Sequence, residues 1–176
     1  MRIPNIRFLG TGGPRAEFDI HRPEGGTSVI EVSGLVGRAL AQYFRQHPAE
    51  LVYIDRRKFE ELVAEIWFGF GYEVELTKQT RDGGKDIIAV GGRETSNRYL
   101  IECKRPDPPT KIDVRPVREL LGVKQDDPAT KAILVTTSWF TEDARQIEER
   151  NRWSLELRDY DGLMMWLKMY GLFAGD

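Results

Sequence analysis

Three charged residues stand at the ends of two neighbouring apolar runs near the middle of the chain. Asp86 begins the run D-I-I-A-V, while Glu102 and Lys104 end the run Y-L-I-E-C-K. If the two runs pair as a hairpin, these three side chains come together. Because successive side chains of a strand point to opposite faces, Glu102 and Lys104 share one face and Cys103 takes the other. The spacing therefore predicts two carboxylates and an ammonium on one face of a sheet.

These three side chains predict a metal-dependent hydrolysis. Two carboxylates within about 4 to 6 Å of each other repel unless a cation lies between them. Mg²⁺ suits such a site, since it binds one or two carboxylates, keeps several waters and binds substrate phosphates. We expect Asp86, Glu102 and the backbone carbonyl of Cys103 to hold Mg²⁺, with Mn²⁺ as a substitute. Lys104 would orient or deprotonate the attacking water, or offset the charge that builds on a phosphodiester.

An E-x-K triplet at the end of a strand has a second interpretation. It is also a common solvated ion pair between neighbouring strands, with no catalytic role. Asp86 favours the functional interpretation, because a charge at the start of a buried strand is unfavourable without a partner. A noncatalytic module that binds nucleic acid or supports an assembly stays open as the alternative.

The surrounding motifs resemble a known family. D-G-G-K-D and E-C-K follow F-E-E-L-V-A and G-Y-E-V, and they precede A-I-L-V-T-T-S-W-F-T-E-D-A. In this order, over about residues 55–170, the motifs resemble the catalytic domain of Mrr-type restriction endonucleases, within the PD-(D/E)xK nuclease superfamily. The resemblance implies an α/β fold of the restriction-endonuclease type, with a mixed central sheet flanked by helices. It also implies an Mg²⁺-dependent endonuclease that hydrolyses DNA. A junction-resolving nuclease of the same superfamily is not separable from this one by sequence.

The resemblance adds further candidate residues. The family has a glutamate near the metal on its first helix, which the F-E-E-L-V pattern matches to Glu60. Glu61 and Glu65 are alternatives if the register differs, although three carboxylates on one helix usually mark a solvated face. Candidate contacts to DNA are the cations Lys85, Arg105 and Arg118.

Apolar spacing predicts an alternation of helices and strands. Period-3.6 patterns begin after cap residues Asp55, Asp113 and Thr141. A last helix ends at Gly171, and its Met, Leu and aromatic stripe is typical of a core face. The expected strands cover residues 72–77, 86–90, 99–104, 131–137 and 154–158, and the other expected helices cover 34–46, 56–70, 114–125 and 142–151.

The 176 residues favour one domain with an appendage. We expect residues 1–54 to form an N-terminal extension with one amphipathic helix, and residues 55–176 to form the nuclease domain. The Gly- and Pro-rich start contains one expected strand, Ser28 to Val32. Deletion of residues 1–33 should therefore leave a folded domain.

Composition restricts the location and the partners. The formal net charge of −2 is not typical of a strong nucleic-acid binder, so any DNA-binding groove must be local. One cysteine and the absence of a signal pattern or an apolar run of membrane-spanning length indicate a cytoplasmic protein without a membrane span. Cutting both strands of DNA needs two active sites, so we expect a homodimer. The first 54 residues are short for a DNA-reading domain, which leaves specificity to a separate chain.

Overall fold

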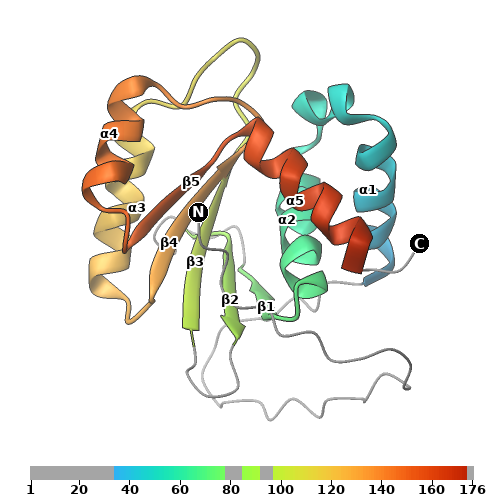
Figure 1. Ribbon diagram of the computed structural model, residues 1–176, viewed down its shortest axis with the longest axis horizontal. Helices are drawn as coiled ribbons and strands as arrows, with labels where there is room; N and C mark the ends of the chain where they lie inside the picture. Colours follow the sequence, from blue (N-terminus) through green and yellow to red (C-terminus); the bar gives the residue numbers. More distant parts are fainter. Residues whose placement is uncertain (1–33, 78–84, 92–96, 174–176) are drawn as a thin grey trace.

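A five-stranded mixed sheet lies between two layers of helices (Figure 1). The computed structural model describes residues 34–77, 85–91 and 97–173. The strand order along the sheet follows the chain, with antiparallel pairing from β1 to β3 and parallel pairing from β3 to β5. The predicted α/β class with a mixed sheet is confirmed. The strands are β1 (Glu73–Leu76), β2 (Ile87–Gly91), β3 (Asn97–Lys104), β4 (Lys131–Thr136) and β5 (Leu155–Arg158).

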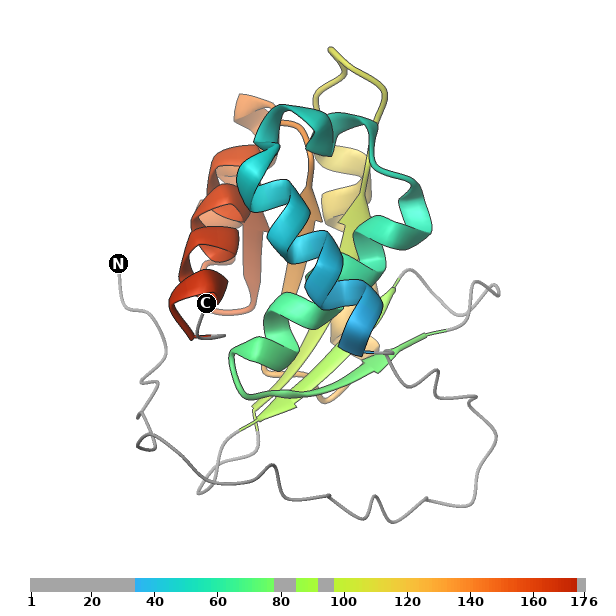
Figure 2. The same cartoon turned by 90° about the vertical axis from the view of Figure 1, so that its right-hand side faces the viewer.

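The helices cover both faces of this sheet. Helices α1, α2 and α5 lie on one side, and α3 and α4 lie on the other (Figures 1 and 2). Within the residues that the structure describes, every helix is too short or too polar to span a lipid bilayer. The helices are α1 (Gly34–Gln46), α2 (Arg56–Gly69), α3 (Val114–Asp126), α4 (Glu142–Arg150) and α5 (Tyr160–Phe173), with a short 3-10 helix η1 (Pro48–Tyr53) between α1 and α2.

Side-chain caps fix where three of the helices begin. The Asp55 carboxylate accepts hydrogen bonds from two backbone N–H groups in the first turn of α2, at 2.9 and 3.2 Å. Asp113 and Thr141 each accept one such bond at the start of α3 and α4. A cap of this kind stabilises a helix by about 1 kcal/mol. The three predicted caps are confirmed. Gly71, with φ of +88°, follows the end of α2, where a left-handed residue is expected.

The alternation of β3 divides its side chains between the two layers. Tyr99, Ile101 and Cys103 belong to the core formed with α1, α2 and α5. Leu100 packs in a cluster on the α3 side, and the period-2 rule places Glu102 and Lys104 on that same face. The predicted separation of Glu102 and Lys104 from Cys103 is confirmed.

The usual meaning of three carboxylates on one helix, a solvated face, does not hold for two glutamates of α2. Glu60, which the resemblance assigned to the site, and Glu65 are only 3% and 2% exposed. For Glu65 the reason is tertiary, because α1 and α5 pack beside α2 (Figure 2). Glu65 accepts a hydrogen bond of 2.6 Å from the hydroxyl of Tyr170 on α5. On its other side Glu65 meets Gly37 of α1, where only a residue without a side chain fits.

Helix α1 shares the larger core of the fold. Its residues Ala41 and Phe44 are buried in the same cluster as α2 and α5. The division between residues 54 and 55 stays a prediction, and the strand expected at Ser28 to Val32 lies outside the described residues. Helix α5 continues to Phe173, two residues beyond the predicted end.

Two glycines in helices provide a matched test of this packing. A Cβ atom at Gly122 would meet no atom within 4 Å, so Gly122→Ala should stabilise the fold by about 0.5 to 1 kcal/mol through the better helix propensity of alanine. A Cβ atom at Gly37 would lie 2.6 Å from Cβ of Glu65. Gly37→Ala should therefore lower the free energy of unfolding by about 1 to 3 kcal/mol, because α1 must move away from α2. Urea unfolding measures both, and equal stability of the two variants would contradict the packing described.

Candidate active site

The register of β2 and β3 brings two carboxylates together. Ile87 pairs with Ile101, and Asp86, the residue before it, donates its N–H to the carbonyl of Ile101. Beyond the larger effect of burial, the charge of Asp86 acts to raise the pKa of Glu102, and the charge of Lys104 acts to lower the pKa of Asp86, so the three groups lie close together. Lys104 Nζ lies 2.5 Å from Oε1 of Glu102. The structure therefore brings together the three side chains predicted to meet.

Backbone hydrogen bonds hold Asp86 between its two neighbouring strands. Its Oδ2 accepts a hydrogen bond of 2.7 Å from the backbone N–H of Cys103. Its own N–H donates to the carbonyl of Ile101, and its carbonyl accepts from Thr77 after β1. The carboxylate is thus positioned by the ends of β1 and β3.

Glu60 approaches this pair from α2. Its Oε2 accepts a hydrogen bond of 2.8 Å from Arg57, one helical turn earlier. The charge of Asp86 acts on Glu60 and raises its pKa, in addition to the larger effect of burial. The structure therefore places Glu60 near the candidate site, as the resemblance implied, and leaves Glu61 and Glu65 outside that set.

Burial dominates the electrostatics of the site. It raises the pKa of Asp86, against the hydrogen bond from Cys103 and the nearby cations, which lower it. Burial also raises the pKa of Glu102, and the hydrogen bond and charge of Lys104 oppose this shift. One oxygen of Glu102, Oε2, is buried and accepts no hydrogen bond from the described residues. The site thus contains carboxylate oxygens whose charge is incompletely compensated.

A donor set of this kind fits a hard divalent cation. Oxygen ligands from one or two carboxylates are what Mg²⁺ prefers, with water completing its coordination. Across the described residues, no three His, Cys, Asp or Glu side chains gather as a metal-binding group. A cation at Asp86 and Glu102 would therefore depend on backbone and water oxygens for the rest of its ligands.

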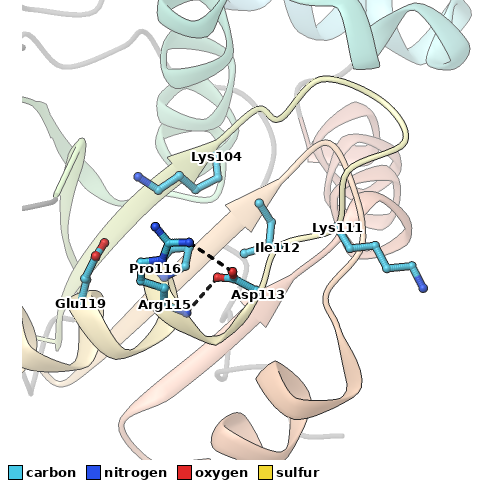
Figure 3. Close-up of a pocket in the computed structure, with 7 residues that line it drawn as sticks. All are labelled: Lys104, Lys111, Ile112, Asp113, Arg115, Pro116 and Glu119. Carbon is cyan, nitrogen blue, oxygen red and sulfur yellow. Dashed lines mark hydrogen bonds and ion pairs between the residues drawn. The ribbon is translucent and has the colours of Figure 1, made fainter.

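A shallow cavity of about 270 Å³ opens beside Lys104 (Figure 3). Two of its cations are already engaged, since Lys104 pairs with Glu102 and Arg115 lies 3.6 Å from Asp113. The third, Lys111, points away from the cavity (Figure 3). The cavity therefore has little net positive charge and provides access to Lys104 from solvent. Its lining residues are Lys104, Lys111, Ile112, Asp113, Arg115, Pro116 and Glu119.

The three predicted DNA contacts lie in different environments. Arg118 is exposed on α3 and makes no hydrogen bond or ion pair with the part of the chain that the structure describes. Arg105 pairs with Asp107 at 3.0 Å. Lys85 lies 3.3 Å from Asp127, so its charge is partly offset. A role of each cation in DNA binding stays a prediction.

Two arginines at the start of α2 also act on the site, and neither was predicted from the sequence. Arg56 and Arg57 both act on Asp86 and lower its pKa, although less strongly than burial raises it. Arg57 also donates to Glu60 and to the carbonyl of Thr77. The sequence did contain a signal for Arg57. The predicted cap at Asp55 fixes where the helix begins, and residues 57 and 60, three apart on a helix, are then neighbours on its surface.

The raised pKa of Asp86 predicts how stability depends on pH without metal. The folded state keeps the Asp86 proton to higher pH than the unfolded state, so this residue lowers stability as pH rises through its folded pKa. Asp86→Asn should therefore be more stable than the parent at neutral pH. The difference should shrink as pH falls and vanish below the ordinary pKa of about 3.9, where Asp86 is protonated in both the folded and the unfolded state. Urea unfolding in EDTA across this range checks the sign, and a less stable variant at neutral pH would contradict it.

Structures of other proteins share this fold. The DNA modification-dependent restriction endonuclease AspBHI superposes with a TM-score of 0.56 at 20% identity, over 84% of this chain and 40% of that protein. The protein of unknown function AF1548 superposes with a TM-score of 0.53 at 18% identity, over 64% of this chain and 65% of that one. At these identities the likeness shows the fold alone.

A sequence relative and a family model extend the comparison. An uncharacterised protein, y4cE, from Sinorhizobium fredii (strain NBRC 101917 / NGR234) is 28% identical over 172 residues. The match covers 94% of this chain and 44% of that relative, so the chain spans less than half of the relative's length. Residues 51–167, more than half of the chain, match the model of the Mrr catalytic domain, described as a restriction endonuclease. The chain therefore belongs to the restriction endonuclease family defined by the Mrr catalytic domain.

Proposed function

We propose that this nuclease domain hydrolyses phosphodiester bonds of DNA as an Mg²⁺-dependent endonuclease. The observation that carries the proposal is the proximity of Asp86 and Glu102 at adjoining ends of β2 and β3, with Lys104 2.5 Å from Glu102. Membership of the restriction endonuclease family supports cleavage of DNA. AspBHI, which shares this fold, is a DNA modification-dependent restriction endonuclease. We propose that this chain likewise acts on modified DNA.

Asp86 and Glu102 would hold the metal, together with the backbone carbonyl of Cys103. The free oxygen of Glu102 and the raised pKa of both carboxyls support this assignment. When bound, Mg²⁺ or Mn²⁺ supplies a Lewis acid that polarises the phosphate and lowers the pKa of water. The backbone N–H of Cys103 keeps Asp86 in position for this role.

Lys104 and Glu60 complete the proposed site. The Lys104 ammonium is 38% exposed and borders the cavity, so it can meet a phosphate oxygen or a water that enters from solvent. We assign it to orient that water or to offset charge on the phosphate. Arg57 holds the Glu60 carboxylate beside Asp86, and we assign Glu60 a positioning role there.

The proposed partners are DNA, a second copy of this chain and a specificity element. One active site cuts one strand, and a two-fold homodimer would supply the second site. The relative from Sinorhizobium fredii is more than twice as long as the matched region, which supports a separate specificity chain or domain.

The ion pair between Lys104 and Glu102 also supports a second candidate function. In a noncatalytic module of this fold that binds nucleic acid or supports an assembly, the pair would be structural. The two candidates differ in whether the lysine contributes to a reaction rate.

The metal requirement is tested first by cleavage of plasmid DNA. Asp86→Asn and Glu102→Gln should each lower cleavage in Mg²⁺ by about 10²-fold or more, since loss of metal charge stabilisation costs several kcal/mol. Glu156→Gln is the matched control, because this carboxylate pairs with Lys131 in a cross-strand ion pair elsewhere on the sheet. It should cleave like the parent. Equal cleavage in EDTA and in Mg²⁺ would defeat the proposal.

Lys104→Ala separates the nuclease from the noncatalytic module. If Lys104 assists the reaction, the single-turnover cleavage rate should fall by about 10²-fold or more, while DNA affinity changes little. If the pair is structural, stability should change by no more than about 1 kcal/mol and the rate should stay constant. Lys131→Ala is the control, because Lys131 also forms a cross-strand ion pair, 3.4 Å from Glu156. An unchanged rate for Lys104→Ala would sink the catalytic assignment.

A further inference from the structure

An exposed tryptophan lies at the same sheet edge as Lys104. Strands β3 and β4 run parallel, and Lys104 stands opposite Thr136 in their register. The chain therefore leaves both strands at one edge, and Trp139 follows three residues after Thr136. The Trp139 side chain is 45% exposed. An aromatic ring is thus accessible at the sheet edge where β3 ends with Lys104.

The surrounding structure holds this ring in place. The indole packs on Tyr160 with ring centroids 5.5 Å apart, and its N–H donates to Asp161 at 3.3 Å. Its backbone carbonyl accepts from Ile112 at 2.9 Å. A fixed aromatic ring binds a partner at a low cost in conformational entropy. Trp139 is therefore preorganised while nearly half of its surface faces solvent.

A lysine stands next to the tryptophan. Ile112 and Phe140 form a parallel bridge, so the preceding residues, Lys111 and Trp139, are neighbours on the two segments. Lys111 is exposed and makes no ion pair with the described residues. It also borders the cavity that contains Lys104 (Figure 3). Lys111 is thus a lining residue of this cavity and a backbone neighbour of Trp139, and its ammonium extends away from the cavity (Figure 3).

The surroundings fit a nucleotide better than a protein surface. Protein-binding sites present contiguous apolar area. Here Ile112 and Phe140 are each only 7% exposed, and the neighbours of the ring that reach solvent include Lys111 and Asp161. A single aromatic face beside a cation matches a nucleobase with its phosphate, since every base has a π-face and every nucleotide has an anionic backbone.

We propose that Trp139 and Lys111 form a nucleotide-binding subsite, in which the indole stacks on an unpaired base and the ammonium contacts its phosphate. This inference rests on the proposed function, and it names the substrate class of the same site. A fully paired duplex hides the faces of its bases. The preferred substrate therefore carries an unpaired or extruded nucleotide close to the cleaved bond.

Trp153 provides a matched control. It is 81% exposed and lies under the guanidinium of Arg152 at 5.2 Å. The next residue, Ser154, accepts a hydrogen bond from Ala132 at the start of β4. Trp153 is thus at the opposite edge of the sheet from Trp139, with a comparable aromatic and cationic environment.

The test uses the full chain with Asp86→Asn, which prevents cleavage, and three DNA oligonucleotides. They are a duplex with 2-aminopurine in a single-base bulge, the same duplex fully paired, and the single strand. Trp139→Leu should weaken binding of the bulged and single-stranded DNA by about 5- to 100-fold, the range of one base stacked on an aromatic ring. Trp139→Phe should retain most of the affinity. Trp153→Leu should leave it unchanged. Lys111→Ala should weaken binding. It should also reduce the dependence of the logarithm of DNA affinity on the logarithm of salt concentration by about the amount expected for one phosphate contact.

Two readouts make the outcome decisive. Fluorescence of 2-aminopurine in the bulge should be quenched by the parent and not by Trp139→Leu. Absence of quenching in the parent would overturn the inference even if the Leu variant failed to fold. Unchanged affinity of folded Trp139→Leu, or equal losses of affinity for paired and bulged DNA, would also overturn the inference. Neither result would bear on the proposed cleavage of DNA, which the plasmid assay tests separately. Failure of the parent to bind any of the three DNAs would instead overturn the proposed function together with the inference.

Discussion

The pairing register of β2 and β3 is the constraint on which the candidate active site depends. It brings Asp86, just before β2, to the end of β3 that contains Glu102, and it also buries Ile87 and Ala89 in the core. A slip of one residue would move every side chain of β2 to the other face. Core packing therefore holds together two like charges that would otherwise separate. The free energy of folding, rather than any attraction between the carboxylates, maintains the site.

Positive groups from three directions compensate this burial in part. Lys104 contacts Glu102 from β3, and Arg56 and Arg57 act on Asp86 from the start of α2. The backbone N–H of Cys103 adds a hydrogen bond to Asp86. Protein cations and a divalent metal would compete for the same carboxylates, so binding of metal would free the lysine for other contacts.

The local sequence pattern was sufficient to predict the strands and the meeting of Asp86, Glu102 and Lys104, because the three residues lie at adjoining ends of one hairpin. Helix starts were also predictable, since a cap such as Asp113 acts within one turn. Burial of Glu65 was not predictable, because it depends on α1 packing against α2, with Gly37 in contact.

Contacts between residues distant in sequence explain the other misses. Lys85 meets Asp127, which stands 42 residues later in the chain and whose pKa is lowered chiefly by its hydrogen bond with Arg98. No periodicity within a strand or a helix contains that information. The exposure of Trp139 was hidden in the same way, because it is set by the path of the chain after β4 and by contacts with α5.

The bridge between Ile112 and Phe140 makes one unit of two loops that are distant in sequence. A hydrogen bond of 2.6 Å from Ser138 to the carbonyl of Thr110 joins the same two loops. This rim contains none of the paired carboxylates, which come from the hairpin of β2 and β3. If the chain cleaves DNA as proposed, substitutions or insertions in the rim would alter which DNA reaches the site without disturbing that hairpin. Substrate choice and bond cleavage can therefore diverge independently as related chains evolve.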